Sequence, residues 1–241
     1  LGKVPSPKIL LKAFEEVKPN LILTVPLILE KIYKKMILPQ LSKTTMKVAL
    51  NIPLLDSRIY AQIRKKLVDA FGGRFREVIV GGAAMNEEVT NFLYKIKFPF
   101  TIGYGMTECG PLISYDHNDE YVPGSCGQIL KGIMKVRIDS EDPYNKVGEI
   151  QVSGENVMKG YYKNEEATSK VFTEDGWLRT GDLGTIDADN RIYIRGRSKT
   201  MILGASGQNI YPEEIESKLN NLPFVMESII IEKNGKLVGL V

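Results

Sequence analysis

The hexapeptide Tyr-Gly-Met-Thr-Glu-Cys, which starts at residue 104, combines residue types that suit nucleotide binding. Tyr104 offers an aromatic face on which a flat base could stack, and the glycines Gly103 and Gly105 let the backbone approach such a ligand closely. Thr107 and Glu108 place a hydroxyl beside a carboxylate, a pairing that suits a phosphate together with its Mg²⁺ ion. Taken alone, the same residues are equally compatible with a strand-to-turn transition that binds nothing.

Two further stretches carry charged side chains of the kind that bind a ribose. Asp182 follows a glycine at the predicted end of a tight turn, where its carboxylate could accept two hydroxyl hydrogen bonds that the charge strengthens. Arg197 brings a planar fork that can pair with ribose or phosphate oxygens, and Lys199 could lie at a hinge that takes up a backbone rotation. Alternatively, Asp182 stabilises only its own turn, and the two basic residues form a solvated turn.

The fourth stretch runs from Leu203 to Glu216 and is rich in glycine. Its glycines suit a loop that lets a narrow ligand pass close to the backbone. Pro212 is predicted to begin a helix, and the acidic residues that follow favour the positive end of that helix. By itself this stretch is also compatible with a loop and a well-capped helix.

The first 104 residues alternate helix-like and strand-like segments, which predicts βαβ units and a parallel sheet covered by helices. We expect one helix from Ser6-Pro7 to about Lys18, a second that begins at Pro26, a third from after Ser57 to Phe71, and a fourth that Asn86 caps. Strands are expected at residues 20–25, 77–80 and 98–104. Ligands bind such sheets at the carboxyl ends of the strands, where Gly81-Gly82 and residues 103–105 fall.

After about residue 124 the pattern changes to short strands and glycine-rich turns, with strands expected at residues 134–138, 149–153 and 191–195. A helix is expected again near Pro212 and a strand at residues 225–232. We therefore predict a large domain over residues 1–197, with an α/β sheet to about residue 123 and a β-rich layer over 124–197. A small α+β domain is predicted to begin at residue 198.

Composition argues against several classes of protein. The net charge of +3 argues against a dedicated nucleic-acid binder, which should show a concentrated basic stripe. Cys109, Cys126 and His117 are too few for a disulfide framework or a Cys/His zinc cluster. There is no run of about 18 apolar residues and no signal-peptide pattern, so we expect a cytoplasmic protein.

Taken together and in this order, the four stretches resemble those of AMP-forming acyl-CoA synthetases of the adenylate-forming superfamily. Further similarities are residues 81–85, 148–154 and 160–163, and the resemblance extends from about residue 20 to residue 232. The segment from Lys18 to Pro26, with Glu30-Lys-Ile-Tyr33 behind it, is most similar to bacterial long-chain fatty-acid–CoA ligases.

This resemblance implies that ATP and a fatty acid form an acyl-adenylate, and that coenzyme A then displaces AMP, with Mg²⁺ as the metal cofactor. The resemblance also implies a role for each candidate residue. Gly81, Gly82 and Ala83 line the adenine and acyl pocket, and Tyr104, flanked by Gly103 and Gly105, stacks on adenine. Thr107 contacts the α-phosphate, Glu108 holds Mg²⁺, and Asp182 and Arg197 bind the ribose hydroxyls.

Two positions belong to the movement of the small domain and to the second substrate. Lys199 is the hinge of the small domain, and Gly207 lies near the pantetheine tunnel.

Some positions depart from the family's pattern. The Ser/Thr/Gly-rich phosphate loop with its Lys has no equivalent here, and the catalytic lysine near the family's C-terminus would lie beyond Val241. We therefore expect a central fragment of a longer enzyme that is inactive in adenylation by itself. Thr200 follows the hinge lysine, where the family commonly has Asp.

Two alternatives to a CoA ligase remain open at this point. An adenylation domain that loads a carrier-protein thiol would carry the same motifs, and so would a nucleotide-binding relative that has lost the reaction. The expected partners are small molecules and not nucleic acid. Peripheral contact with a membrane is compatible with a lipid substrate, although no amphipathic basic helix in the sequence supports it.

Overall fold

The computed structural model describes residues 7–204, 207–222, 225 and 227–241, and the chain folds into two compact units. Unit 1 comprises Leu1–Ile102 and Asp116–Pro123, and unit 2 comprises Gly103–Tyr115 and Gly124–Val241. The domain boundary expected near residue 198 lies within unit 2 and stays a prediction. The expected helix cap Ser6 and residues 205–206 of the fourth stretch lie outside the described residues.

Unit 1 contains the expected parallel sheet, in the order β1 (Leu21–Thr24), β2 (Glu77–Val80) and β3 (Phe100–Ile102). Every residue of β3 is buried, and in β2 only Ile79 is partly exposed. Strands that are covered on both faces are mostly apolar, which agrees with the valine and isoleucine side chains of β2 and with Phe100 and Ile102 of β3. The predicted strand over residues 98–104 is wrong in its extent, because Gly103 interrupts it and the chain passes into unit 2 there.

The helices of unit 1 follow the apolar spacing. They are α1 (Pro7–Val17), α2 (Pro26–Ile32), α5 (Leu55–Ala70) and α6 (Glu87–Lys95). The Asn86 side chain caps α6 as expected, accepting a hydrogen bond from the Val89 amide at 3.3 Å. Helix α5 begins at Leu55, earlier than predicted, after Leu54 in a left-handed conformation with φ 70°.

Aromatic rings form the core beside this sheet. The rings of Phe14 and Phe71 stack with centroids 5.3 Å apart, and Phe75 and Phe98 each contact Phe71 at 6.0 and 5.8 Å. Gly72 follows with φ +93°, and a Cβ there would lie 2.4 Å from the Phe14 carbonyl oxygen. Glycine is therefore required where α5 ends against α1.

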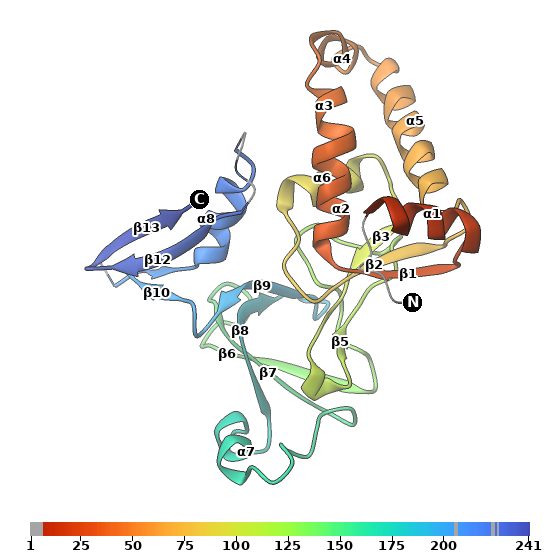
Figure 1. Cartoon of the computed structure of the whole chain (residues 1–241). Coiled ribbons are helices and arrows are strands. Elements are labelled where there is room, and N and C mark those ends of the chain that lie inside the picture. The colour runs from red at the N-terminus through yellow and green to blue at the C-terminus, as the bar shows by residue number, and fades with distance from the viewer. Residues whose placement is uncertain (1–6, 205–206, 223–224, 226) are drawn as a thin grey trace. The chain divides into compact units, whose positions relative to one another are not determined.

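A helical extension between α2 and α5 was not expected from the sequence. It contains a π-helix, η1 (Tyr33–Ile37), followed by α3 (Leu38–Leu41) and α4 (Thr44–Ala49). Figure 1 shows α3 and α5 extending away from the β1–β2–β3 sheet, with α4 at the far end. We call residues 31–66 the helical arm. None of the described helices is long and apolar enough to cross a membrane.

Unit 2 is built on an antiparallel sheet of four strands, β6 (Met134–Asp139), β7 (Gly148–Gly154), β8 (Leu178–Ile186) and β9 (Ile192–Arg197). The short pair β4 (Tyr104–Gly105) and β5 (Leu112–Ser114) and the helix α7 (Glu165–Val171) belong to the same unit. The core is formed by side chains that are almost fully buried, among them Ile113, Ile150, Leu178 and Ile192.

The C-terminal segment of unit 2 forms a small α+β arrangement. Strands β10 (Ile202–Leu203) and β11 (Asn209–Ile210) form one antiparallel pair, and β12 (Ile229–Lys233) and β13 (Lys236–Leu240) form another. Helix α8 (Pro212–Leu219) has Pro212 in its first turn, as expected, and contacts β12. The strand expected at residues 225–232 begins only at Ile229.

Candidate functional site

The Tyr104–Ser114 segment forms a tight hairpin that presents Thr107 and Glu108. Strands β4 and β5 pair antiparallel, and the Met106 amide donates to the Pro111 carbonyl oxygen at 2.8 Å. Thr107 and Glu108 lie in a short 3₁₀ helix, η2 (Thr107–Cys109), at the end of this hairpin. A Cβ on Gly105 would lie only 2.0 Å from the Pro111 carbonyl oxygen, so this position requires glycine for close approach rather than for an unusual φ.

Asn156 braces the hairpin from a neighbouring segment. Its Nδ2 donates to the carbonyl oxygens of Cys109 and Leu112, at 2.6 and 2.9 Å. Close by along the chain, the Met158 amide donates to the carbonyl oxygen of Glu108 at 2.7 Å. Asn156 has no predicted role, because it lies two residues beyond the 148–154 similarity.

Asp182 lies in strand β8 and not in the tight turn that was predicted for it. The turn occurs earlier, where the Gly176 amide donates to the Thr173 carbonyl oxygen at 2.9 Å. The pairing of β8 with β7 skips near Gly181, which has φ +73°, so the ladder is irregular at this point. Irregular pairing of this kind redirects side chains, and Asp182 lies opposite Arg197 on β9.

The structure brings Tyr104, Asp182 and Arg197 together. The Tyr104 hydroxyl donates to Asp182 Oδ2 at 2.7 Å, and Arg197 Nε donates to Asp182 Oδ1 at 2.9 Å. The Asp182 side chain is 14% exposed, and the Arg197 side chain is 61% exposed. A carboxylate can accept about four hydrogen bonds, so this one retains acceptor capacity for hydroxyl groups of a ligand.

Tyr104 is held as a neutral hydrogen-bond donor. Burial raises its pKa far above the ordinary value of 10.0, and the negative charge of Asp182 raises it further. The ring is only 7% exposed, within the core of unit 2. The Thr180 hydroxyl donates to the Ile150 carbonyl oxygen at 2.8 Å and accepts from the Asp182 amide at 3.1 Å. No role was predicted for Thr180, although it lies in the same stretch as Asp182.

Glu108 has a partner that the sequence did not indicate. The Tyr161 hydroxyl donates to Glu108 Oε1 at 2.9 Å, and this hydrogen bond raises the pKa of Tyr161. The Tyr161 amide in turn donates to the Thr168 hydroxyl at 2.9 Å, which ties the segment to α7. Tyr161 belongs to the 160–163 similarity, so the motif was visible, but nothing in it indicated contact with Glu108.

Glu108, the predicted magnesium ligand, suits a Mg²⁺ ion that binds together with the phosphates of a nucleotide. Among the described residues, no group of three or more His, Cys, Asp or Glu side chains could enclose a metal ion. Mg²⁺ is commonly bound by one or two carboxylates together with substrate phosphates and water. The single carboxylate of Glu108, oriented by Tyr161 beside the Thr107 hydroxyl, is compatible with that arrangement.

The remaining predicted site residues occupy loops. In unit 1, Gly81, Gly82 and Ala83 follow β2, and Gly82 has φ +85° with no atom within 4 Å of an added Cβ. In unit 2, Gly103 precedes Tyr104, and Lys199 lies in an exposed turn between β9 and β10. Gly207 lies between β10 and β11, and its amide donates to the Gly204 carbonyl oxygen at 2.8 Å.

Cys109 and His117 are not part of a catalytic arrangement in the described structure. Cys109 is fully buried, and desolvation raises the pKa of its thiol to about 11, so it is protonated at neutral pH. The His117 side chain is 69% exposed and lies 3.5 Å from Glu77 Oε1. Cys109 therefore acts as a small side chain that fills space in the core.

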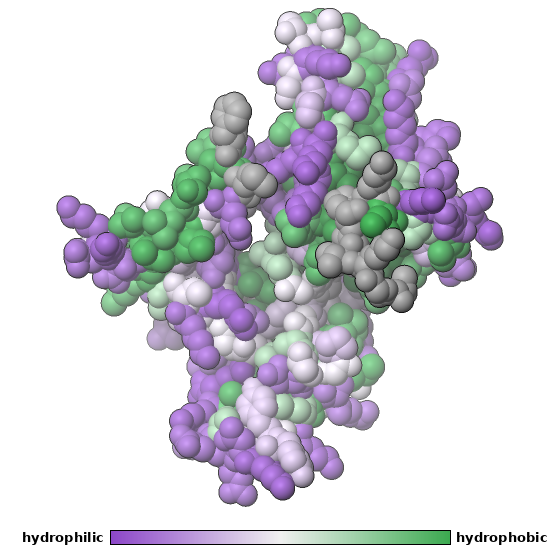
Figure 2. All heavy atoms as spheres, in the orientation of Figure 1, coloured by the Kyte–Doolittle hydropathy of each residue, from purple (hydrophilic) through white to green (hydrophobic). Residues whose placement is uncertain are grey.

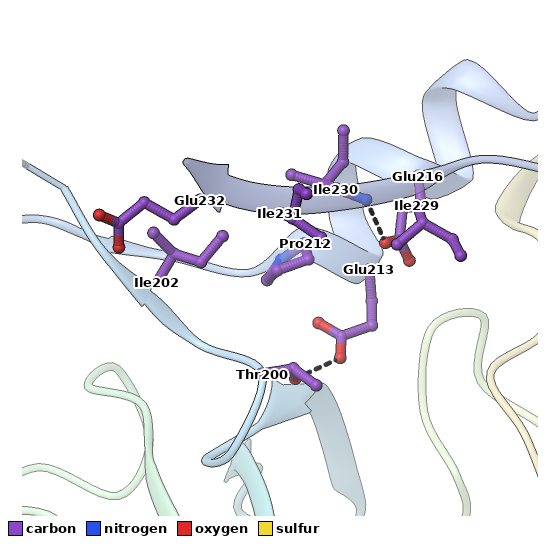
Figure 3. Close-up of a pocket in the computed structure, with 9 residues that line it drawn as sticks. All are labelled: Thr200, Ile202, Pro212, Glu213, Glu216, Ile229, Ile230, Ile231 and Glu232. Carbon is purple, nitrogen blue, oxygen red and sulfur yellow. Dashed lines mark hydrogen bonds between the residues drawn. The ribbon is translucent and has the colours of Figure 1, made fainter. Parts of the chain in front are cut away.

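A cavity of about 360 Å³ lies in the C-terminal segment, and no predicted site residue lines it. Figure 3 shows mainly isoleucine side chains from β10 and β12 around it, with carboxylates from α8. Glu213 accepts from the Thr200 hydroxyl at 2.6 Å, and Glu216 accepts from the Ile230 amide at 2.8 Å. These carboxylates therefore already have structural partners.

The chain matches the model of a family described as AMP-binding enzyme over residues 2–162. The chain belongs to this family of AMP-binding enzymes. It is 28% identical to long-chain-fatty-acid–CoA ligase 1 of Saccharomyces cerevisiae over 94% of its own length, and 34% identical to 4-coumarate–CoA ligase 2 of Narcissus pseudonarcissus over 75%. It spans only about a third of these relatives, 35% and 34% of their lengths.

Solved structures of similar fold agree with membership among the AMP-binding enzymes. MatB from Rhodopseudomonas palustris with ATP bound is 28% identical, with a TM-score of 0.69 over 94% of this chain and 40% of that one. The o-succinylbenzoate–CoA synthetase of Bacillus subtilis, in complex with ATP and magnesium, is 26% identical, with a TM-score of 0.71 over 98% and 43%. The α/β fold predicted from the sequence is thereby confirmed.

Proposed function

We propose that the whole protein to which this AMP-binding chain belongs activates a fatty acid as an acyl-adenylate at the expense of ATP and that the acyl group then passes to coenzyme A. One observation carries the proposal: Asp182 meets both Tyr104 and Arg197 although the three come from separate stretches of the chain. A carboxylate, a guanidinium and a hydroxyl that converge in this way form a polar site suited to the hydroxyl groups of a ribose.

In this proposal the nucleotide is held mainly through Asp182. The ribose hydroxyls donate to the acceptor positions that Tyr104 and Arg197 leave unused. Tyr104, kept neutral by burial, fixes the orientation of the carboxylate by donating to Oδ2. Arg197 offsets the negative charge of Asp182 and offers its remaining N–H groups to oxygen atoms of the nucleotide.

In the first step, an oxygen of the fatty-acid carboxylate forms a bond to the α-phosphorus while the bond from that phosphorus to pyrophosphate breaks. This step depends chiefly on positioning and on neutralising phosphate charge. Thr107 donates its hydroxyl to an α-phosphate oxygen, and Glu108, oriented by Tyr161, would hold Mg²⁺. When bound, Mg²⁺ would supply positive charge that offsets the charge of the phosphates.

In the second step, a thiolate attacks the acyl carbon and AMP leaves. The turn after β9 contains Lys199, and we assign it to the backbone rotation between the two steps. Gly207, in the β10–β11 loop, leaves open space at its α-carbon through which the pantetheine arm could pass. A carrier-protein thiol would use the same chemistry, so binding of coenzyme A distinguishes the two acceptors.

The choice of a fatty acid rests on the resemblance of residues 18–33 to bacterial long-chain fatty-acid–CoA ligases. Relatives of both kinds align with similar shares of this chain: 94%, 73% and 66% for three long-chain-fatty-acid–CoA ligases, and 75%, 74% and 68% for three 4-coumarate–CoA ligases. A hydroxycinnamate is therefore the second candidate.

Calorimetric titration of the 241-residue chain with ATP and AMP tests the proposal. Asp182→Ala should weaken both affinities by about 1–3 kcal/mol, because it removes charged hydrogen bonds to the ribose. Asp175→Ala is the matched control: Asp175 is exposed in the same unit, where it pairs with Arg137 and contacts no predicted site residue. Unchanged affinity in Asp182→Ala would remove the site from consideration.

Non-hydrolysable acyl-adenylate analogues distinguish the substrates. A palmitoyl-sulfamoyl adenosine should bind more tightly than AMP, whereas the 4-coumaroyl analogue should not. The reverse order would support the aromatic acid as substrate. Equal binding of AMP and both analogues would support a nucleotide-binding protein without an acyl site.

A further inference from the structure

The helical arm concentrates positive charge that the composition of the whole chain conceals. Residues 31–66 contain nine lysine and arginine residues and a single acidic residue, Asp56, which gives this segment a net charge of +8. The rest of the chain contains 23 basic and 28 acidic residues, so its net charge is −5. A difference of this size within one small segment is typical of a surface that meets an anionic partner.

Most of these basic side chains are exposed. They come from η1, from the start and body of α4, and from α5: Lys35, Lys43, Lys47, Arg58, Arg64, Lys65 and Lys66. Lys65 pairs with Asp69 at 2.7 Å. In the described part of the chain no carboxylate lies within ion-pair distance of Lys43, Lys47 or Arg58.

Exposed aliphatic side chains lie between these charges, from the last turn of α4 through the joining segment to the first residue of α5. Val48 is 59% exposed, Ile52 48% and Leu54 80%, and Leu55 is also exposed. Apolar side chains that are grouped in this way on a projecting segment indicate a binding surface rather than chance exposure. In Figure 2 this end of the arm shows green apolar surface beside purple hydrophilic surface.

The base of the arm is anchored, so the arm is a defined element of unit 1. Tyr33 on η1 and Tyr60 on α5 both contact the ring of Phe92 on α6, with ring centroids 5.1 and 6.5 Å from that of Phe92. The Tyr33 hydroxyl also donates to Glu88 Oε1 at 2.8 Å. The segment around α4 therefore forms the free end, as Figure 1 shows.

We propose that the helical arm docks on the surface of a membrane that contains anionic lipids. The side chains of Val48, Ile52 and Leu54 enter the interfacial region, and Lys43, Lys47 and Arg58 contact lipid phosphates. A nucleic acid would fit the charge, but sites for single strands add aromatic stacking platforms, and the end of this arm carries aliphatic side chains instead. Docking is independent of the proposed nucleotide chemistry.

Flotation of the 241-residue chain with lipid vesicles tests the proposal. The chain should bind vesicles of phosphatidylcholine mixed with phosphatidylglycerol and should bind pure phosphatidylcholine only weakly. Raising the salt from about 0.1 M to about 1 M should release much of it, because the screening length falls from about 10 Å to about 3 Å. Salt-insensitive binding, or equal binding to both vesicles, would contradict the role of charge.

A charge-reversal variant locates the contact on the arm. The triple variant Lys43→Glu/Lys47→Glu/Arg58→Glu should lose at least about 100-fold in partitioning, since each basic residue near such a surface contributes about 1 kcal/mol. The matched control Lys131→Glu/Lys135→Glu/Lys159→Glu changes the same net charge at exposed positions outside the arm and should stay within about 10-fold of the unmodified chain. Equal losses in the two variants would overturn the proposal.

Insertion of the apolar end has its own readout. The indole introduced by Leu54→Trp should be quenched by brominated lipids, whereas the native indole of Trp177 should not. The triple variant must bind ATP like the unmodified chain, so failure to dock and failure to bind nucleotide remain distinguishable. The unmodified chain could instead bind a single-stranded oligonucleotide and no vesicles, and the triple variant could lose that binding. This result would identify a nucleic acid as the partner and would contradict the membrane proposal.

Discussion

The site around Asp182 in unit 2 and the helical arm of unit 1 differ in how far their charged side chains are exposed to solvent. At Asp182 the carboxylate is 14% exposed, and each of its oxygen atoms accepts a hydrogen bond from a side chain. On the arm, lysine and arginine side chains are exposed along several helices, beside aliphatic residues that are also exposed. The first arrangement can recognise the geometry of one ligand, and the second can recognise only the charge of a surface.

This difference predicts how the two regions respond to substitution. A polar group that is largely buried depends on a few hydrogen bonds, so one change leaves its partners unsatisfied. Exposed charges act at longer range and roughly in sum, so a single change on the arm should lose only its own share of the binding, about 1 kcal/mol per charge. The predictions below test this contrast, from the largest expected effect to the smallest.

Gly105→Ala should show how rigid the hairpin is. The added Cβ would overlap the Pro111 carbonyl oxygen, which is backbone and cannot rotate away, so we expect unfolding to become easier by about 3 kcal/mol or more. Gly132→Ala is the control, since Gly132 has φ +78° but open space around an added Cβ, and it should cost about 1–2 kcal/mol. If urea unfolding showed similar losses of unfolding free energy in the two variants, the hairpin would have room for a Cβ at residue 105.

Alkaline pH should act on the buried groups around the site. Burial raises the pKa of Cys109 from its ordinary value of 9.0 to about 11 and that of Cys126 to about 12. Below pH 9 both the native and the unfolded thiols stay protonated, and stability is unchanged. Between pH 9 and 11 only the unfolded thiols ionise, so the free energy of unfolding should fall by up to about 1.4 kcal/mol per pH unit for each thiol.

Urea unfolding between pH 8 and pH 10 measures this slope. Cys109→Ala should make the slope shallower, because one of the two shifted thiols is gone. A slope that does not respond to this substitution would mean that Cys109 ionises equally easily in the native and unfolded chains.

Tyr161→Phe sharpens the comparison, because its hydrogen bond is exposed yet directed at a site residue. The loss of the hydroxyl leaves Glu108 less well oriented, so ATP affinity in the presence of Mg²⁺ should fall about fivefold, by about 1 kcal/mol. Tyr162→Phe changes the neighbouring, 88% exposed tyrosine and should have no effect. An equal loss with and without Mg²⁺ would argue against a role through Glu108.

Leu54→Gly should separate stability from docking on the arm. Leu54 has φ 70°, a conformation that costs most residues about 1 kcal/mol and glycine very little, so the variant should be slightly more stable. It should also partition less onto anionic vesicles, because it lacks an apolar side chain. Leu55→Gly, at the first residue of α5, removes a similar side chain without this gain. Tighter vesicle binding by Leu54→Gly would contradict the assigned role of the apolar end.

Much of unit 1 was predictable because its signals are local. The apolar runs of β1 and β2, the Asn86 cap and the spacing of apolar residues in α5 all act over a few residues. The helical arm was not predictable in the same way, because α3 and α4 are short and begin without side-chain caps. Its charge was readable in the sequence, but its projection from the sheet was not.

The candidate site shows a similar division. The residue types at positions 104, 182 and 197 already indicated hydroxyl and phosphate recognition. The contacts of Asn156 with the hairpin and of Tyr161 with Glu108 could not be inferred, since each joins positions more than 40 residues apart. The turn predicted at Asp182 was wrong because pairing with β9 overrides the local preference of Gly-Asp for a turn.

The sequence by itself determined the chemistry available to this protein: which hydroxyl, carboxylate and guanidinium groups it has, their order along the chain, and the concentration of positive charge in residues 31–66. Only the tertiary structure decided which of these groups share a partner and which face solvent. The physical reason is that side-chain identity is a local property, whereas strand register, burial and hydrogen bonding between distant segments depend on the whole fold.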